Sequence, residues 1–308
     1  MTIRSFTKSL LSVFIGIFTL QAAQAADSCS AESEVALQIL GSGGPIADDG
    51  RASSGFLVWI DGKSRVLIDA GGGTFLRFGE AGAHFIDLEF VGLSHFHTDH
   101  SADFAALIKS GNFSTRKRSL RVAGPDGDRM FPGLNGFLTS LFDSDAGAYA
   151  YLSSFLDGTS GTPMLTRREV GRGDPVVVYQ SEGLVVDAMR VPHGIVPAVA
   201  FRVRAGDKTI VFASDQNGSD PAFADFAADA TILVMHMVVP EGIEGVARRL
   251  HAPPSVIGGI AAAASPDTLV LSHFMARSLH KIDRNVALVR ERYDGRIVLA
   301  EDLMCVMP

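Results

Sequence analysis

Short apolar runs bounded by glycine, proline or aspartate recur along this chain, and runs of this kind predict β-strands. Asp61-Gly62, which lies between two of these runs, is typical of a hairpin turn. Residues 176–191 and 199–213 predict two further hairpins. The other predicted strands cover residues 35–40, 56–60, 64–69, 88–93, 120–123, 232–236, 269–272 and 297–300.

Apolar residues at helical spacing predict helices between the strands. These helices cover a segment that starts near Asp103 and residues 127–143, 223–228, 255–264 and 285–293. Residues 144–174 are less regular and rich in Gly, Ser and Thr, and they fit either a variable insert beside a site or a helical hairpin packed on the body. Strand-rich halves that alternate with helices predict an α/β fold, an αββα sandwich of two mixed β-sheets flanked by helices.

The composition fits a globular protein with one large core. The 308 residues are 47% hydrophobic and 20% charged, and we find no internal repeat, low-complexity tract or heptad run. One domain over residues 26–308 therefore fits the length better than several small domains.

Residues 1–25 have the pattern of a secretory signal peptide. Arg4 and Lys8 form a basic start, an apolar run extends from Leu10 to Leu20, and residues 23–25 form a small-x-small cleavage sequence. The apolar run is too short for an ordinary membrane span, and an uncleaved amphipathic helix is the alternative. We therefore expect a periplasmic or secreted protein that has no membrane attachment after processing.

The chain is acidic, with a net charge of −7 that becomes −9 without residues 1–25. So acidic a protein is poorly suited to tracking a long polyanion by bulk electrostatics. Basic runs at residues 116–121 and 167–172 leave a local basic patch open, although such runs are more often solvated loops. Cys29 and Cys305 are the only cysteines, and they can form a disulfide in an oxidising compartment or remain two separate thiols.

The densest chemistry lies in residues 94–100, directly after the apolar run of residues 88–93. His95, His97 and His100 supply imidazoles there, and Asp99 supplies a carboxylate. In an extended segment His95 and His97 point to the same side, and Asp99 and His100 follow at the start of the next helix. One short loop can therefore direct ligands at two neighbouring metal ions. A surface histidine cluster without a role is the alternative.

Three more candidate ligands follow later predicted strands. His193 comes after the alternating run that starts at Leu184, Asp215 comes after residues 209–212, and His273 comes after residues 269–272. The carboxyl ends of strands present reactive side chains on a rigid support. We therefore group these three residues with the histidine-rich loop.

The pattern His-x-His-x-Asp-His, with these later residues, resembles the metallo-β-lactamase superfamily. The resemblance implies that one divalent metal ion is held by His95, His97 and His193. It implies that a second is held by Asp99, His100 and His273, and that Asp215 bridges the two. Imidazole and carboxylate ligands suit zinc, although iron and manganese also fit. The resemblance also implies hydrolysis by a metal-bound hydroxide that Asp99 orients.

Within the superfamily the chain is similar to the ribonuclease Z-like branch, through residues 41–54, 67–74 and 250–274. His251 matches a histidine that acts as a general acid in that branch, so the resemblance implies a catalytic role for His251. A packing role at a helix start is the alternative. Two segments depart from the branch. Ala252-Pro253 replaces Ser/Thr-Thr, and Met237 replaces the glutamate that follows a histidine matched by His236.

We therefore expect an exported binuclear-metal hydrolase, a ribonuclease Z-like phosphodiesterase that acts on a small or short phosphodiester or a related ester. Transfer RNA is not expected as a substrate. The chain has the pattern of an exported protein, and it lacks the long Gly- and basic-rich arm with which that branch grips transfer RNA. The alternatives are a lactonase, a sulfatase, a β-lactamase-type hydrolase or a non-enzymatic metal-binding protein. A homodimer is left open.

Overall fold

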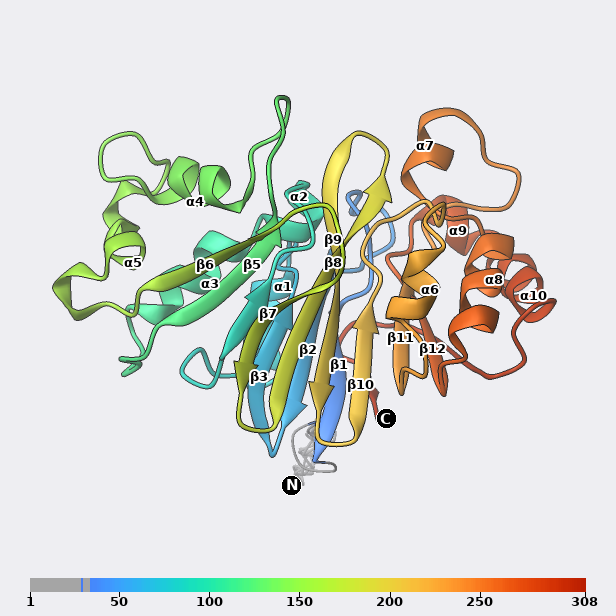
Figure 1. Cartoon of the computed structure of the whole chain (residues 1–308), viewed down its shortest axis with the longest axis horizontal. Coiled ribbons are helices and arrows are strands. Elements are labelled where there is room, and N and C mark those ends of the chain that lie inside the picture. The colour runs from blue at the N-terminus through green and yellow to red at the C-terminus, as the bar shows by residue number, and fades with distance from the viewer. Residues whose placement is uncertain (1–28, 30–33) are drawn as a thin grey trace, which may run out of the picture.

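The computed structural model describes Cys29 and residues 34–308, and the predicted signal peptide lies outside these residues. Two mixed seven-stranded sheets pack face to face (Figure 1). The first sheet has the order β14-β1-β2-β3-β4-β5-β6. Its strands are β1 (Val35–Gly41), β2 (Gly55–Ile60), β3 (Lys63–Ile68), β4 (Phe90–Gly92), β5 (Leu120–Pro125), β6 (Leu165–Val170) and β14 (Cys305–Val306).

The second sheet has the order β13-β12-β11-β10-β9-β8-β7. Its strands are β7 (Val176–Ser181), β8 (Leu184–His193), β9 (Val196–Ala205), β10 (Lys208–Phe212), β11 (Ile232–His236), β12 (Thr268–Ser272) and β13 (Arg296–Leu299). In each sheet antiparallel hairpins come first and parallel strands follow. The parallel strands bring their carboxyl ends to one edge of each sheet.

Helices cover the outer faces of both sheets (Figure 1). The helices connected with the first sheet are α1 (Thr74–Glu80), α2 (Thr98–Ser101), α3 (Phe104–Gly111), α4 (Leu134–Phe142) and α5 (Ser154–Asp157), with the 3₁₀ turns Ala150–Leu152 and Thr159–Gly161. Those connected with the second sheet are α6 (Ala222–Phe226), α7 (Gly245–Leu250), α8 (Pro254–Ala264), α9 (Ala276–Leu279) and α10 (Ile282–Arg290). Among the described residues no helix combines the length and apolarity needed to cross a bilayer.

Alternate residues of β2 bury opposite faces of the first sheet. Phe56 and Val58 belong to the core between the two sheets, whereas Leu57 and Trp59 belong to the core under the helices of the first sheet. Because both faces are covered, the strand has a continuous apolar sequence rather than an alternating one. This burial on both sides confirms the predicted αββα sandwich.

Most predicted elements are present, and the exceptions have local causes. The helix predicted over residues 127–143 begins only at Leu134, because Asp128 Oδ1 accepts the backbone N–H groups of Met130 and Phe131 in a turn and Pro132 follows. Residues 144–174 are not a helical hairpin, since they contain short helical turns and then β6, which pairs in parallel with β5. The elements that were not predicted are helices α1, α5, α7 and α9 and strands β6 and β14.

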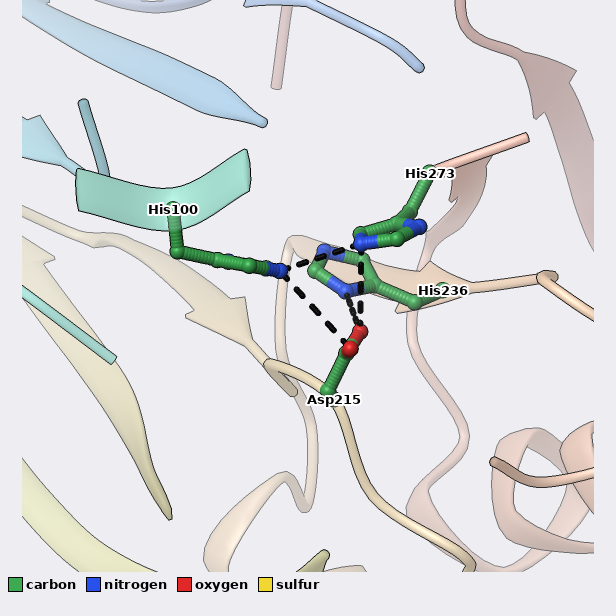
Figure 2. A group of neighbouring side chains, drawn as sticks. All are labelled: His100, Asp215, His236 and His273. Atoms are coloured by element: carbon green, nitrogen blue, oxygen red, sulfur yellow. Dashed lines mark hydrogen bonds and ion pairs between the residues drawn. The ribbon is translucent and has the colours of Figure 1, made fainter. Parts of the chain in front are cut away.

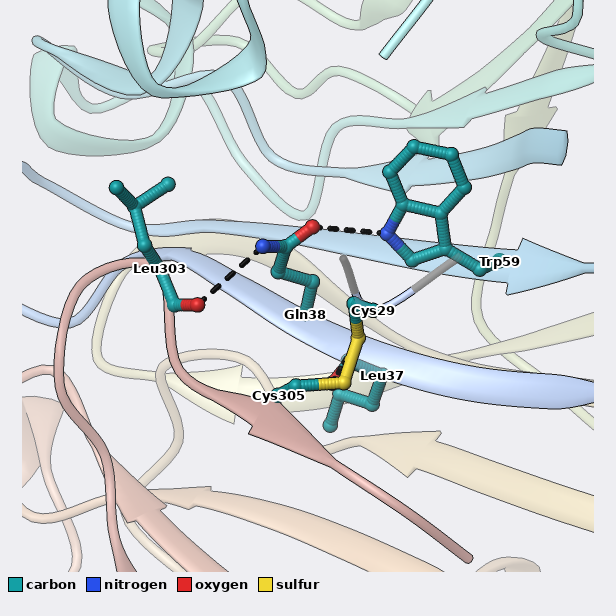
Figure 3. The surroundings of a disulfide bond; sticks show 6 residues. All are labelled: Cys29, Leu37, Gln38, Trp59, Leu303 and Cys305. Carbon is teal, nitrogen blue, oxygen red and sulfur yellow. Dashed lines mark hydrogen bonds between the residues drawn. A yellow bond between two sulfur atoms is a disulfide. The ribbon is translucent and has the colours of Figure 1, made fainter. Parts of the chain in front are cut away.

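A disulfide between Cys29 and Cys305 joins the start of the described chain to β14, with Cα atoms 5.5 Å apart (Figure 3). Beside it, the Gln38 side chain accepts a hydrogen bond from Trp59 Nε1 and donates one to the Leu303 carbonyl. The alternative of two separate thiols is wrong. The bridge and these bonds fix the carboxyl-terminal segment along β1.

Candidate metal centre

The candidate ligands meet where strands from both sheets end. His95 lies three residues after β4, His193 is the last residue of β8, Asp215 follows β10 by three residues, and His273 directly follows β12. Asp99 and His100 lie in α2, whose first turn continues the loop from β4. Strand ends of two packed sheets thus bring together residues that are up to 178 positions apart in the sequence.

The first set is His95, His97 and His193. His95 Nε2 lies 2.9 Å from His97 Nδ1, and the three residues have ligand atoms within 4.8 Å of one another. Two nitrogen ligands of one zinc ion, each at about 2.0–2.1 Å, lie roughly 3.3 Å apart. The spacing of these imidazoles therefore suits a shared ion.

The second set is Asp99, His100 and His273. His100 Nε2 lies 3.0 Å from His273 Nε2, and Asp99 Oδ2 lies 3.2 Å from His273 Nε2 and 3.6 Å from His100 Nε2. All three side chains are buried. Their atoms converge as the ligands of one ion would.

Asp215 contacts both sets, and Figure 2 shows it facing His100 and His273 of the second set. Its Oδ2 is 3.7 Å from Nε2 of His193, which belongs to the first set, and 3.7 Å from Nε2 of His100, which belongs to the second. Its Oδ1 is 3.5 Å from His273 Nε2. One carboxylate thus faces both groups of imidazoles, which is the position of a bridging ligand.

Outer partners fix the orientation of these ligands. Asp69 Oδ2 lies 2.8 Å from His100 Nδ1, and the Leu250 carbonyl accepts a hydrogen bond of 2.9 Å from His193 Nδ1. His236 Nδ1 donates to Asp215 Oδ1 at 2.7 Å (Figure 2). Partners of this kind set the ring orientation and the tautomer of ligating histidines. In His100 and His193 the nitrogen bonded to the outer partner is Nδ1, so Nε2 is the atom directed at the centre.

An unpartnered buried nitrogen and the types of ligand present both fit a metal site. His193 Nε2 is buried, faces Asp215, and has no hydrogen-bond partner among the described residues. A buried polar atom without a partner is costly, and a metal ion would satisfy it. Imidazole nitrogens and carboxylate oxygens are the ligands that divalent transition metals prefer. The residues present therefore fit two divalent ions.

Burial and mutual charge shift the pKa values strongly at this centre. Burial, reinforced by the charges of His100 and His193, lowers the pKa of His95 well below its usual value. Burial opposes ionisation of Asp215, but the surrounding His273, His251 and His100 outweigh it and hold its pKa well below the usual range. At neutral pH the centre therefore offers a neutral imidazole at His95 and an ionised carboxylate at Asp215, the protonation states that a metal ion requires.

His251 lies between α7 and α8, two residues before the Pro253 N-cap of α8, and it is beside the first set. Its Nδ1 is 3.7 Å from Asp215 Oδ2, and its ring centroid is 5.3 Å from that of His193. Burial lowers the pKa of His251 to about 3, although the Asp215 charge opposes this. Met237 stands where the ribonuclease Z-like branch has a glutamate. It is fully buried and apolar, so it cannot supply the negative charge of that glutamate. Protonation of His251 would therefore need a substrate anion beside it.

Two residues of the centre, Asp69 and His236, were not predicted from the sequence as functional. The sequence contained a signal for both residues. Asp69 directly follows the apolar run of β3, and His236 ends that of β11, which is the kind of position that His273 has after β12. The seven predicted ligands do come together in the structure, and His251 lies next to them.

The profile of the β-lactamase superfamily domain matches residues 64–274, which is more than half of the chain. The chain therefore belongs to this family, and it is a metal-dependent hydrolase. It is 25% identical over 281 residues to a ribonuclease Z of Mycobacterium marinum, covering 87% of this chain and 97% of the relative.

Two solved structures share the fold. The short form of human tRNase Z has a TM-score of 0.67 at 19% identity and covers 88% of this chain and 98% of its own. Zn²⁺-bound PqqB from Methylobacterium extorquens has a TM-score of 0.62 at 15% identity and covers 89% of this chain and 100% of its own.

These similarities confirm a ribonuclease Z-like hydrolase of the metallo-β-lactamase superfamily. They give no support to the expectation that transfer RNA is not a substrate, because the relatives carry the names ribonuclease Z and tRNase Z.

Proposed function

We propose that this protein is an exported phosphodiesterase that hydrolyses a phosphodiester or a related ester with two zinc ions. The observation that carries the proposal is the position of Asp215, whose carboxylate faces His193 of one ligand set and His100 of the other within 3.7 Å. The ribonuclease Z name of the sequence relative favours a phosphodiester, and the zinc bound in the similar PqqB structure favours zinc.

Two divalent ions in such a centre supply an acidified water as nucleophile and positive charge for the oxygens of the displaced group. His95, His97 and His193 would hold one ion, Asp99, His100 and His273 would hold the other, and Asp215 would serve both. Asp99 is also close enough to the centre to accept a hydrogen bond from the nucleophile and orient it. His251 lies beside the first set, where it would protonate the leaving oxygen once a substrate anion is bound.

The test is hydrolysis of bis(p-nitrophenyl) phosphate, compared with a lactone, an aryl sulfate and a cephalosporin. We expect the phosphodiester to have the highest kcat/KM and the purified protein to hold about two metal equivalents, as a two-metal site requires. Asp215→Asn should abolish turnover, whereas Asp283→Asn, an exposed carboxylate of α10, should not. A higher kcat/KM for one of the other three substrates, or a metal content near zero after metal-supplemented refolding, would contradict the proposal.

Export is part of the proposal, and it rests on the pattern of residues 1–25 and on the Cys29–Cys305 disulfide. Amino-terminal sequencing of protein taken from the periplasm or the medium should begin at residue 26. Full-length chain retained in the cytoplasm would contradict it. The oligomeric state, which the sequence left open, is measured in the same material by light scattering.

A further inference from the structure

A large hollow lies beside the metal centre and reaches His193. Its volume is about 1010 Å³, and its walls are the loop between β5 and α4, the loop before β7, the tip of the β8–β9 hairpin and the segment that leads into α6. In Figure 1 the β5–α4 loop, the β8–β9 hairpin and α7 all rise at the same end of the molecule. Because His193 is a candidate ligand, a substrate held at the metal centre would extend into this hollow.

Two large apolar side chains that line the hollow are exposed and come from different loops. Met130 on the β5–α4 loop is 61% exposed, and Ile195 at the hairpin tip is 67% exposed. The neighbouring loops continue this pattern, since Ile46 lies two residues after Gly44, which adjoins the His273 ring, and Val246 lies on α7. Ile46 is 50% exposed and Val246 is 61% exposed. Ile46 and Val246 are not among the residues that line the hollow, whereas Met130 and Ile195 are. Exposed apolar residues that line a cleft indicate a surface that binds an apolar group.

The charges of the hollow do not suit a long polyanion. Its arginines are Arg172, Arg190 and Arg202, and four aspartates line it as well. Arg190 is paired with Asp126 and Arg202 with Asp187. Only Arg172 of the three has no ion pair among the residues that the structure describes, so the hollow has no row of free cations to follow successive phosphates.

We infer that the substrate is an anionic ester with an apolar alkyl or aryl group, and that this group occupies the hollow between Met130 and Ile195. The inference rests on the proposed function for the position of the anionic group at the metal centre. Burial of one CH₂ group corresponds to roughly fourfold in affinity, so the length of the apolar group should affect binding directly.

The experiment is a series of p-nitrophenyl alkyl phosphates with methyl, butyl and octyl groups, together with calorimetric titration of the matching alkylphosphonates. Hydrolysis adds water at phosphorus and releases p-nitrophenolate, so the alkyl group is retained on the product. We expect kcat/KM to rise at least about tenfold from methyl to octyl, mainly through KM, because several CH₂ groups become partly buried. The phosphonate dissociation constants should fall in the same order.

Two variants and one control distinguish binding of the alkyl group in the hollow from nonspecific binding to other apolar surfaces. Ile195→Ser and Met130→Ser should each reduce the octyl-to-methyl ratio by about threefold or more, since each removes one apolar wall. Phe113→Ser is the control, because Phe113 is 83% exposed and lines a different hollow, between α1 and α3. It should leave the ratio as in the wild-type protein.

A ratio near one across the series, or an unchanged ratio in both wall variants, would overturn the inference. A higher kcat/KM for precursor transfer RNA than for the octyl ester would overturn it as well. The phosphonate titration keeps the two proposals apart. If no phosphodiester is hydrolysed, the proposed function fails, yet tighter binding of octylphosphonate that both wall variants weaken would still support an apolar binding site here.

Discussion

At the scale of single residues, the metal centre is held by backbone conformations that side chains seldom adopt. Asp69, Ser214 and His273 have positive φ angles of 60°, 59° and 55°. Each is a candidate ligand, a partner of a ligand or the neighbour of one. Such conformations cost free energy, so they persist only where surrounding contacts impose them. Asp69, for example, accepts hydrogen bonds from the backbone and the hydroxyl of Ser94 while it contacts His100.

Asp69→Ala should weaken metal binding without removing a predicted ligand. Loss of the bond to His100 Nδ1 frees the ring, and removal of an outer partner typically reduces metal affinity by about 10–100-fold. Competition with a chromogenic chelator measures this loss. Asp283→Ala, at an exposed site in α10, is the control and should bind metal as the wild-type protein does. An unchanged affinity in Asp69→Ala would show that His100 needs no orienting partner.

His251→Ala should retain both metal ions and lose roughly 10²–10⁴ in rate on esters with poor leaving groups, because a positioned proton donor contributes about that much. Esters with p-nitrophenolate, which leaves without a proton, should be affected much less. The two substrate types, measured on the same preparation, give the comparison. Loss of metal from this variant would instead identify His251 as a ligand, consistent with its position near His193 and Asp215.

At the scale of elements, Glu89 connects the two sheets through β3, β4 and β7. It precedes β4 and receives hydrogen bonds from Arg65 of β3 and from Tyr179 and Ser181 of β7. Burial would raise the pKa of Glu89, but the hydrogen bonds from Arg65, Ser181 and Tyr179 outweigh it and lower the pKa to about 2. One carboxylate thus helps to hold β7, an edge strand of the second sheet, against the first sheet.

Glu89→Gln should lower the free energy of unfolding by roughly 1.5–3 kcal/mol at pH 7, the range for hydrogen bonds to a charged group. The folded pKa of about 2 lies below the ordinary value of 4.5. The contribution is therefore complete above about pH 4.5 and is lost as the pH falls towards 2. Urea denaturation between pH 7 and pH 3 should show the two proteins converging at low pH. Glu80→Gln, which breaks an exposed pair with Arg77, should cost less than about 1 kcal/mol.

At the scale of the whole molecule, the carboxyl-terminal segment closes the fold against its beginning. Asp302 accepts hydrogen bonds from Ser42 and from the backbone of Ala52, and Ser42 in turn accepts the N–H of Phe274, next to His273. The Cys29–Cys305 disulfide fastens the same segment three residues further on. The two ends of the described chain therefore support the loop that borders the second ligand set.

The double variant Cys29→Ser/Cys305→Ser should be less stable by up to about 5–6 kcal/mol in the chain-entropy model, because the bridge closes a loop across 276 positions. Denaturant midpoints with and without reductant measure this, and reductant should not affect the variant. Thiol titration of denatured, unreduced wild-type protein should find no free thiol. Two free thiols per chain in material from its native compartment would contradict the bridge.

The sequence by itself determined the sandwich and the candidate ligands, for local reasons. Buried strands such as residues 56–60 need apolar side chains on both faces, and a metal site needs imidazoles or carboxylates, which in this chain follow the ends of strands, so both leave a pattern in the chain. His95, His97, Asp99 and His100 are close in sequence and were grouped without any tertiary information. The resemblance then supplied the assignment of His193, Asp215 and His273 to the two sets.

Only the tertiary structure decided which groups support the ligands and what surrounds them. The contact of His236 with Asp215 depends on the parallel pairing of β10 and β11, and that of Asp69 with His100 depends on the turn after β3. The disulfide depended on the distance between two ends of the chain, which composition does not encode. The hollow between Met130 and Ile195 is likewise formed by loops far apart in sequence, and their separation in space is set by how the two sheets pack.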